Sequence, residues 1–260
     1  QDMHYSCAYF RTPEQTLEAA QSAKCEHIRK KLCLKPGQKV LDIGSGWGSL
    51  GLYLAEQEDV QVTGLTLSNE QLGVAKEHAI QRGLDNQVEF RLEDYRNHQG
   101  EYDAVVSVGM FEHVGLRNFD GYFNKVGNLL SRDGIAMIHT IGHMDRPAAT
   151  NPWIRRHIFP GGYIPAISEI SAAIERSPLV FADIEVWRQH YALTLKEWNR
   201  RFQAVRSEFA RDKGERFCRI WEFYLLMCQT AFEVESLVVY QLQLSINNAS
   251  VPTTRDYLYD

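Results

Sequence analysis

Short apolar runs alternate with longer amphipathic stretches through the first 140 residues of the chain. The apolar runs are rich in Val, Leu and Ile and predict strands at 39–43, 60–66, 87–92, 102–108 and 134–141. The stretches between them predict helices at 14–33, 48–57, 69–82 and 118–130. Because strands that alternate with helices form parallel sheets covered on both faces, the pattern predicts an α/β, Rossmann-like fold with a doubly wound, mostly parallel sheet.

The pattern changes after residue 145, where prolines and glycines interrupt the segment at 147–165. Next come a predicted strand at 180–187, two long helices at 194–211 and 214–233, and a closing strand at 237–244. We expect a single domain with four parts: an N-terminal lid and helix at 1–34, the Rossmann-like core at 35–145, a helical insertion over the ligand-binding edge at 146–235, and the closing strand with a loosely packed tail at 236–260.

The most distinctive chemistry follows the first predicted strand, which ends in Asp42 and turns through Gly44, Gly46 and Gly48. Glycines there allow positive φ angles and let a ligand approach bare backbone, beside the N-terminal N–H groups of the next helix. A dinucleotide fingerprint would need glycine at Ser49, and the Gly-Lys ending of a Walker loop is absent. An ordinary tight turn would also use glycine, but as a cofactor loop the motif fits S-adenosylmethionine.

Polar and glycine-rich loops at 44–48, 66–71, 92–95, 109–115 and 139–143 follow the predicted strands. In a doubly wound sheet, ligands bind beyond the carboxyl ends of the strands, so these loops should meet at one site. Methyltransferases of this architecture usually carry an acidic residue after the second strand to hold the ribose hydroxyls. This chain runs from Thr66 to Gln71 there without an acid at the strand end, and we expect Gln71 to replace it.

The chain has 260 residues, of which 44% are hydrophobic and 23% charged, as expected for a globular domain. No apolar run approaches the roughly 18 residues needed to span a bilayer. The N-terminus does not resemble a signal peptide, so we expect a cytoplasmic protein. A net charge of −5 argues against a nucleic-acid-binding protein. The five cysteines lack metal-ligand spacing and should be free thiols.

The charge is nevertheless uneven along the second half of the chain. Basic residues outnumber acidic ones within 196–219, and Arg155 and Arg156 lie among bulky apolar residues between Trp153 and Phe159. Mixed basic and apolar side chains suit the surface of an anionic membrane. A solvated helix face beside a buried aromatic cluster would give the same pattern, and this alternative stays open.

Several longer motifs occur in order along nearly the whole chain. They are Tyr-Ser-Cys at 5–7, Leu-Asp-Ile-Gly-Ser-Gly-Trp-Gly at 41–48, Gly-Leu-Thr-Leu-Ser-Asn-Glu-Gln at 64–71, Phe-Glu-His-Val-Gly at 111–115, His-Thr-Ile-Gly at 139–142 and His-Tyr at 190–191. Together they resemble the cyclopropane-fatty-acid synthases, a family that includes the mycolic acid cyclopropane synthases. The resemblance implies a class I S-adenosylmethionine-dependent methyltransferase, and the chain, which begins with Gln1, is expected to be its catalytic domain alone.

The resemblance implies transfer of a methylene group from S-adenosylmethionine to a cis double bond of a phospholipid acyl chain, forming a cyclopropane fatty acid at the inner face of the membrane. An alkene needs positioning rather than a base. Methyl transfer leaves a carbocation, so the site must exclude water and remove a proton before the ring closes. The resemblance also implies bound bicarbonate as the proton acceptor, and a homodimer is a further expectation.

By the same motifs, Glu112, His139 and Tyr191 would hold the bicarbonate, together with backbone groups of Cys7 and Ile141. A tyrosine O–H and a histidine N–H suit the oxygens of a small anion, and a carboxylate can accept its hydrogen. Taken singly, these three side chains would also fit a helix cap, a strand-end histidine and a core tyrosine. The residues implied in cofactor binding are Tyr5, Ser6, Asp42, Gly44, Gly46, Trp47, Gly48, Thr66, Leu67, Ser68, Gln71, Leu92 and Glu93.

Cys228 corresponds to a cysteine proposed as catalytic in the family, but its apolar neighbours predict a helix face lining the acyl channel, where a thiol has a raised pKa. The segment at 188–195 has the shorter His-Tyr form, closer to the mycolic-acid branch than to the phospholipid enzymes. Three alternatives stay open: a sister reaction giving a methyl- or methylene-branched chain, a non-catalytic cofactor-binding protein, and a small-molecule methyltransferase.

Overall fold

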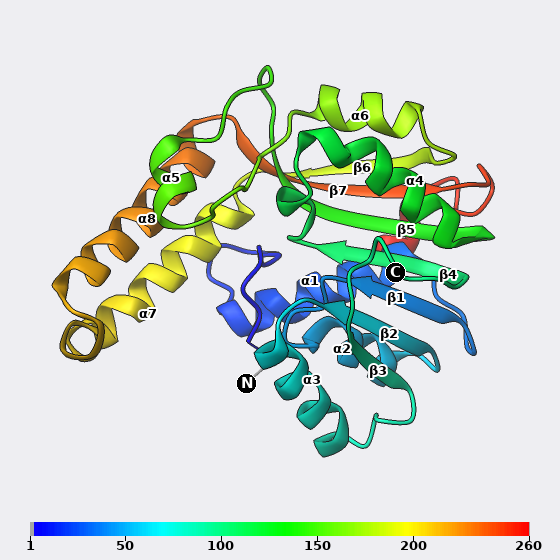
Figure 1. The fold of residues 1–260 in the computed structure, drawn as a ribbon, viewed down its shortest axis with the longest axis horizontal. Coiled ribbons are helices and arrows are strands. Elements are labelled where there is room, and N and C mark those ends of the chain that lie inside the picture. Colours follow the sequence, from blue (N-terminus) through cyan, green and yellow to red (C-terminus); the bar gives the residue numbers. More distant parts are fainter. Residues whose placement is uncertain (1–2, 260) are drawn as a thin grey trace.

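The computed structural model describes residues 3–259 and is built on a seven-stranded sheet with helices on both faces (Figure 1). The strand order is β3-β2-β1-β4-β5-β7-β6, in which β7 runs antiparallel to both neighbours and the other pairs are parallel. The strands are β1 (Lys39–Ile43), β2 (Gln61–Thr66), β3 (Val88–Leu92), β4 (Tyr102–Val108), β5 (Leu130–His143), β6 (Val180–Trp187) and β7 (Leu237–Ser245). The predicted doubly wound, mostly parallel sheet is confirmed.

Helices cover both faces of this sheet and also lie beyond one end of it (Figure 1). They are α1 (Leu17–Leu32), α2 (Ser49–Gln57), α3 (Asn69–Gln81), α4 (Phe119–Leu129), α5 (Pro152–His157), α6 (Ile167–Glu175), α7 (His190–Lys213) and α8 (Glu215–Val234), with short 3₁₀ helices η1 (Phe111–His113), η2 (Leu116–Asn118) and η3 (Asp256–Leu258). Of these, α5, α7 and α8 lie beyond the end of the sheet. An apolar cluster under α1, α2 and α3 includes Ile28 and Val40, and a second cluster under α4 and α6 includes Leu41 and Phe123. Val40 and Leu41 are neighbours on β1, so the clusters lie on opposite faces.

Most predicted helices and strands are confirmed, but three segments differ. β5 begins at Leu130, inside the predicted helix 118–130, because Leu130 pairs with Tyr102 across a register shift. α7 begins at His190 rather than at 194. α5 and α6 occupy a segment where no helix was predicted: α5 has only six residues and lies among prolines and glycines, whereas Ile167, Ile170 and Ile174 of α6 do have helical spacing that the sequence analysis missed.

The segment after Asn247, predicted to be a loosely packed surface segment, is mostly exposed, but its end packs against the domain. Leu258 in η3 is buried, and its carbonyl accepts a hydrogen bond from Lys30 of α1 at 3.2 Å. Arg255 forms an ion pair with Asp183 on β6. A single apolar side chain and one charge, too few to recognise as a pattern, anchor this segment over the edge of the sheet.

Segment 146–235, expected as a helical insertion, contributes to two parts of the structure. β6 joins the sheet beside β7, and α6 packs with α4. α7 and α8 instead pack along each other and extend beyond the end of the sheet, with α5 beside α8 (Figure 1). Within residues 3–259 no helix has the length and apolar character to cross a membrane. The division of the chain into four parts stays a prediction.

Candidate active site

A cavity of about 490 Å³ lies at the carboxyl ends of β1, β4 and β5, between the N-terminal segment and the α7–α8 pair. Its position is that expected for ligands in a doubly wound sheet. The predicted site residues that line it are Tyr5, Ser6, Cys7, Asp42, Gly44, Gly46, Trp47, Glu112, His139, Ile141, Tyr191 and Cys228. Residues separated by more than 200 positions in the sequence therefore share one cavity.

The remaining predicted residues lie outside the lining of this cavity. They are Gly48, Thr66, Leu67, Ser68, Gln71, Leu92 and Glu93. Gln71 connects this outer group to the cavity, because its amide donates to the Tyr5 hydroxyl at 3.3 Å and its oxygen accepts from Thr66 at 3.0 Å. Leu67 and Leu92 are exposed beside it. We call residues 66–71 with Leu92 and Glu93, which lie at and after the ends of β2 and β3, the shelf beside Tyr5; Gly48 instead packs against Phe90.

The glycine loop owes its conformation to backbone freedom and to close packing. Gly44, Gly46 and Gly48 have φ angles of +83°, +55° and +84°. A Cβ on Gly44 would lie 2.9 Å from Met110, and one on Gly48 would lie 2.6 Å from Phe90. At Gly46 the nearest side chain is Tyr5, whose hydroxyl would lie 3.1 Å from an added Cβ. Substitution would strain the backbone at all three positions and would also clash with packed side chains at 44 and 48.

Glu112 in η1 is a buried carboxyl with two different oxygen environments. Its Oε1 accepts the Ile141 N–H at 2.7 Å, while Oε2 has no hydrogen-bond partner within residues 3–259. Burial raises the pKa of Glu112 to about 7, and the hydrogen bond from Ile141 opposes that rise only in part. The resemblance implied backbone groups of Ile141 in bicarbonate binding, but in the structure the Ile141 N–H is occupied by Glu112.

His139 and Tyr191 approach the cavity from β5 and from the first turn of α7. Burial lowers the pKa of His139 well below its usual value, so its imidazole is neutral at pH 7. Its Nδ1 lies 3.1 Å from the amide nitrogen of Gln241 on β7. Tyr191 stacks on Phe232 with ring centroids 4.8 Å apart, and burial raises its pKa, which keeps it a phenol. Both residues are thus neutral hydrogen-bonding groups.

The two predicted cysteines are both neutral thiols in apolar surroundings. Cys7 is completely buried, and burial raises its pKa despite the nearby charge of Lys24. Its segment is held to α7 by a hydrogen bond from the Ala8 N–H to Thr194 at 3.0 Å. Burial raises the pKa of Cys228 to about 12, so this thiol belongs to the apolar wall of the cavity rather than to its reactive groups.

Lys24 is a cavity residue that the sequence analysis missed. It is 1% exposed on α1 and donates to Ser6 Oγ at 3.0 Å and to Gln21 Oε1 at 2.7 Å. Burial raises the pKa of Asp42 to about 7, and the positive charge of Lys24 opposes the rise. A signal was present, since Lys24 falls between Ala20 and Ile28 on the apolar stripe of the helix, where a lysine is unusual.

A sequence profile described as mycolic acid cyclopropane synthetase matches residues 1–242. The chain belongs to this family. Family membership confirms the resemblance to the cyclopropane-fatty-acid synthases. The chain is 42% identical over 243 residues to the cyclopropane-fatty-acyl-phospholipid synthase of Escherichia coli strain K12. That match covers 94% of this chain and 62% of the E. coli protein, so the chain spans less than two thirds of that relative.

Solved structures of family members have the same fold. The cyclopropane synthase MmaA2 from Mycobacterium tuberculosis aligns with a TM-score of 0.88 at 30% identity, over 94% of this chain and 90% of that chain. The mycolic acid cyclopropane synthase CmaA1, crystallised with SAH and CTAB, aligns with a TM-score of 0.87 at 29% identity, again over 94% and 90%. The class I methyltransferase fold predicted from the sequence is confirmed by these matches.

Proposed function

We propose that this protein transfers a methylene group from S-adenosylmethionine to a cis double bond of an unsaturated phospholipid acyl chain, forming a cyclopropane fatty acid. The observation that carries the proposal is the meeting of a glycine loop, an apolar wall and the Glu112, His139 and Tyr191 cluster in one cavity of a family member. The names of the E. coli relative and of the CmaA1 complex support the same reaction class.

The residues around the glycine loop fit the cofactor. Gly44 and Gly46 line the cavity and have no side chain to cover their backbone, and Asp42 and Trp47 line the same cavity. Tyr5 and Ser6 would close over the cofactor, and the shelf of Thr66 to Gln71 with Leu92 and Glu93 would hold its nucleoside end. When bound, S-adenosylmethionine supplies the electrophilic methyl carbon. SAH, which CmaA1 holds, is the demethylated form of that cofactor.

The apolar wall of the cavity would hold the acyl chain. Leu195, Tyr224, Met227, Cys228 and Phe232 line it from α7 and α8. This wall positions the double bond and excludes water from the carbocation that methyl transfer leaves. CTAB in the CmaA1 structure carries a long alkyl chain, which supports an acyl ligand in the family.

The polar end of the cavity fits a bound bicarbonate. Glu112 Oε2 has no hydrogen-bond partner among residues 3–259 and can accept the hydrogen of the anion, and Tyr191 and His139 can donate to its oxygens. Bicarbonate held there would supply the base that accepts the proton of the new methyl group as the ring closes. Ile141 contributes by aligning Glu112, and Cys7 by placing its backbone beside the same end.

The cavity rim suits a phospholipid surface, where the protein would bind peripherally. Phe223 and Leu226 on α8 are each 50% exposed, directly before the lining residues Met227 and Cys228. The Phe223 ring contacts Trp153 of α5 with centroids 4.7 Å apart. The last turn of α5 carries Arg155 and Arg156. Exposed aromatic and aliphatic side chains beside arginines favour an anionic membrane.

The test is incubation of the chain with S-adenosylmethionine, bicarbonate and anionic vesicles of cis-monounsaturated phospholipid. We expect the released fatty acids to gain one CH₂ by mass spectrometry and to show upfield cyclopropane protons by NMR. Olefinic protons on an added methylene would select the sister branching reaction instead. Unchanged acyl chains, with cofactor binding confirmed by calorimetry, would contradict the proposed substrate.

A further inference from the structure

The two faces of β7 differ in chemistry although both are buried. Val238, Tyr240, Leu242 and Leu244 pack into the apolar cluster under α4 and α6. The other face carries Gln241, Gln243 and Ser245, all completely buried on the side of α1. A buried amide is costly unless its hydrogen bonds are satisfied. Each glutamine therefore needs a physical explanation.

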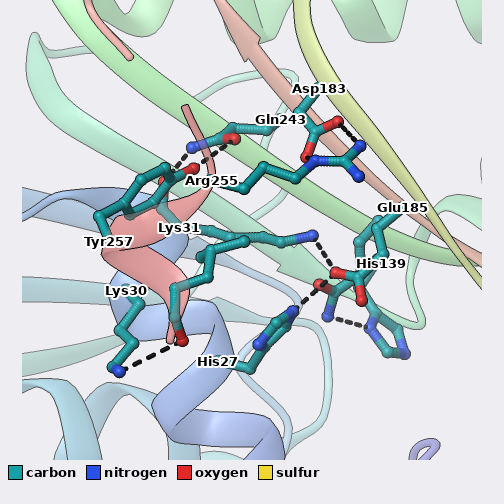
Figure 2. A network of polar contacts seen from close by, with 11 residues as sticks. His27, Lys30, Lys31, His139, Asp183, Glu185, Gln243, Arg255 and Tyr257 are labelled. Atoms are coloured by element: carbon teal, nitrogen blue, oxygen red, sulfur yellow. Dashed lines mark hydrogen bonds and ion pairs between the residues drawn. The ribbon is translucent and has the colours of Figure 1, made fainter. Parts of the chain in front are cut away.

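Gln241 lies in one cross-strand row with a cavity residue and a partly buried carboxylate. It is paired in register with His139 on β5 and with Glu185 on β6. Glu185 lies 2.6 Å from Lys31 Nζ and 2.6 Å from His27 Nε2, both on α1. Figure 2 shows these side chains together with His139 between the sheet and the helix. The row connects the cavity to a buried charged cluster.

The amide nitrogen of Gln241 lies 3.1 Å from His139 Nδ1. A ring nitrogen that accepts this N–H carries no proton, so in the neutral imidazole the proton is on Nε2. The opposite amide orientation would turn the Gln241 oxygen toward His139. In the structure the amide nitrogen faces His139, and ¹⁵N NMR distinguishes the two orientations because the amide oxygen would instead accept a proton on Nδ1.

Fold stability alone does not account for Gln241. Its Oε1 has no hydrogen-bond partner within residues 3–259. Gln243, two positions along, is satisfied at both ends: it donates to the Lys31 carbonyl at 2.6 Å and accepts from Tyr257 at 3.0 Å. An apolar side chain at 241 would avoid the unsatisfied oxygen. What the amide at 241 provides is its contact with His139.

We propose that Gln241 is a positioning residue, whose amide N–H holds neutral His139 in the tautomer that carries its proton on Nε2 and so makes the ring a hydrogen-bond donor to a bound anion. This inference rests on the proposed function, because the anion is the bicarbonate of that reaction. In the other tautomer, an Nε2 lone pair would face the anion and repel its oxygens. Gln241 acts through His139 and does not itself line the cavity.

The direct test is ¹⁵N NMR of histidine-labelled wild-type protein at pH 7. The His139 resonances, assigned by loss in His139→Gln, should show an unprotonated Nδ1 and a protonated Nε2. In Gln241→Glu the new carboxylate should draw the proton to Nδ1. Gln241→Met, an apolar side chain of similar size, should leave a mixture of tautomers. A wild-type His139 protonated at Nδ1, or a tautomer unchanged in both variants, overturns the proposal.

The kinetic test separates positioning from a structural role. In buffer depleted of CO₂, Gln241→Glu and Gln241→Met should raise the bicarbonate concentration for half-maximal rate by about 10- to 100-fold, with the Kd for S-adenosylmethionine unchanged. Gln243→Glu is the matched control: it loses a buried hydrogen bond on the same strand face but should keep the wild-type tautomer and bicarbonate dependence. Equal bicarbonate effects in all three variants would overturn the proposal.

The expected tautomer in a protein that leaves acyl chains unchanged would overturn the proposed function alone.

Discussion

Glu112 combines a fixed oxygen with a free one. The Ile141 N–H holds Oε1, so the carboxyl plane is set by the backbone of β5, and Oε2 is left for a ligand. Because burial raises its pKa to about 7, both protonation states are populated near neutral pH. As a carboxylate the group can accept a hydrogen bond from a bound anion, and as a carboxylic acid it can donate one to the anion. Neither state has a large energetic cost.

Glu112→Gln tests the role of that carboxyl. The amide oxygen can still accept from Ile141, so the fold and the Kd for S-adenosylmethionine should match the wild type. Turnover in the vesicle assay should fall by roughly 10²- to 10⁴-fold, the range for loss of an acid–base group. Near-normal turnover would remove Glu112 from the proton-acceptor site.

The same variant has a pH-dependent effect on stability. The ordinary carboxyl pKa is 4.5 and the folded-state pKa is about 7, so between these values the folded state keeps a proton that the unfolded state has lost. The free energy of unfolding of the wild type therefore falls as pH rises from 4.5 to 7. Above pH 7 the folded state bears the full cost of holding the buried carboxyl in its ionised form. Glu112→Gln lacks this penalty and should be more stable at pH 8 by up to roughly 3 kcal/mol, with little difference at pH 4. Denaturant unfolding at both pH values measures it, and a pH-independent difference would contradict the assignment.

Cys228 is expected to be dispensable for chemistry. Its thiol stays protonated because burial raises its pKa to about 12, and it shares the wall with Met227 and Phe232. Cys228→Ala should keep kcat within about twofold of wild type, since only a small apolar contact is lost. The vesicle assay with saturating lipid checks this, and a loss as large as that of Glu112→Gln would restore Cys228 as a catalytic residue.

At the scale of elements, α1 is unusual because its buried face carries two lysines. Lys24 lines the cavity, and Lys31 is 0% exposed beside Glu185 of β6. Burial lowers the pKa of Lys31, and the carboxylate of Glu185 opposes that change. The helix is thus joined to the sheet by an ion pair as well as by apolar packing (Figure 2).

Glu185→Gln should weaken this connection between α1 and β6. Removing one charge of a buried pair leaves Lys31 uncompensated, so the free energy of unfolding should fall by about 3 kcal/mol. Asp183→Asn is the matched control on the same strand, because its partner Arg255 is 59% exposed and the expected cost is at most about 1 kcal/mol. Urea unfolding of both variants makes the comparison. Equal losses would mean that the Glu185–Lys31 pair stabilises the fold no more than the partly exposed Asp183–Arg255 pair does.

Elements were predictable where their hydrophobic period was long, and less so where partners decided their form. β4 and α4 follow directly from their patterns. The run at 237–244 alternates apolar and polar residues, which normally indicates one solvated face. In the structure α1 and the C-terminal segment cover that face and bury Gln241 and Gln243. No local pattern indicates such a cover.

At the scale of the whole molecule, α5, α7 and α8 all contribute residues to the cavity lining, and α8 also carries the exposed side chains Phe223 and Leu226. We expect the double variant Phe223→Ser, Leu226→Ser to bind anionic vesicles at least about tenfold more weakly than the wild type. Both substitutions remove apolar surface that a bilayer would bury. Ile80→Ser is the control. Ile80 is 66% exposed on α3, far in sequence from Phe223 and Leu226, so this variant should bind vesicles as the wild type does. Vesicle sedimentation measures the binding, and equal weakening by both changes would contradict a rim-specific surface.

The sequence by itself determined the sheet, the glycine loop and the family, because alternating periods and contiguous motifs are local properties. Motif positions also identified Glu112, His139 and Tyr191. Only the tertiary structure decided that the Ile141 N–H serves Glu112, that Lys24 faces the cavity, and that Gln241 adjoins His139. These facts depend on burial and on contacts between distant segments. Because a polar side chain in a strand or helix looks the same in sequence whether it meets water or a buried partner, its role is set by what packs over it.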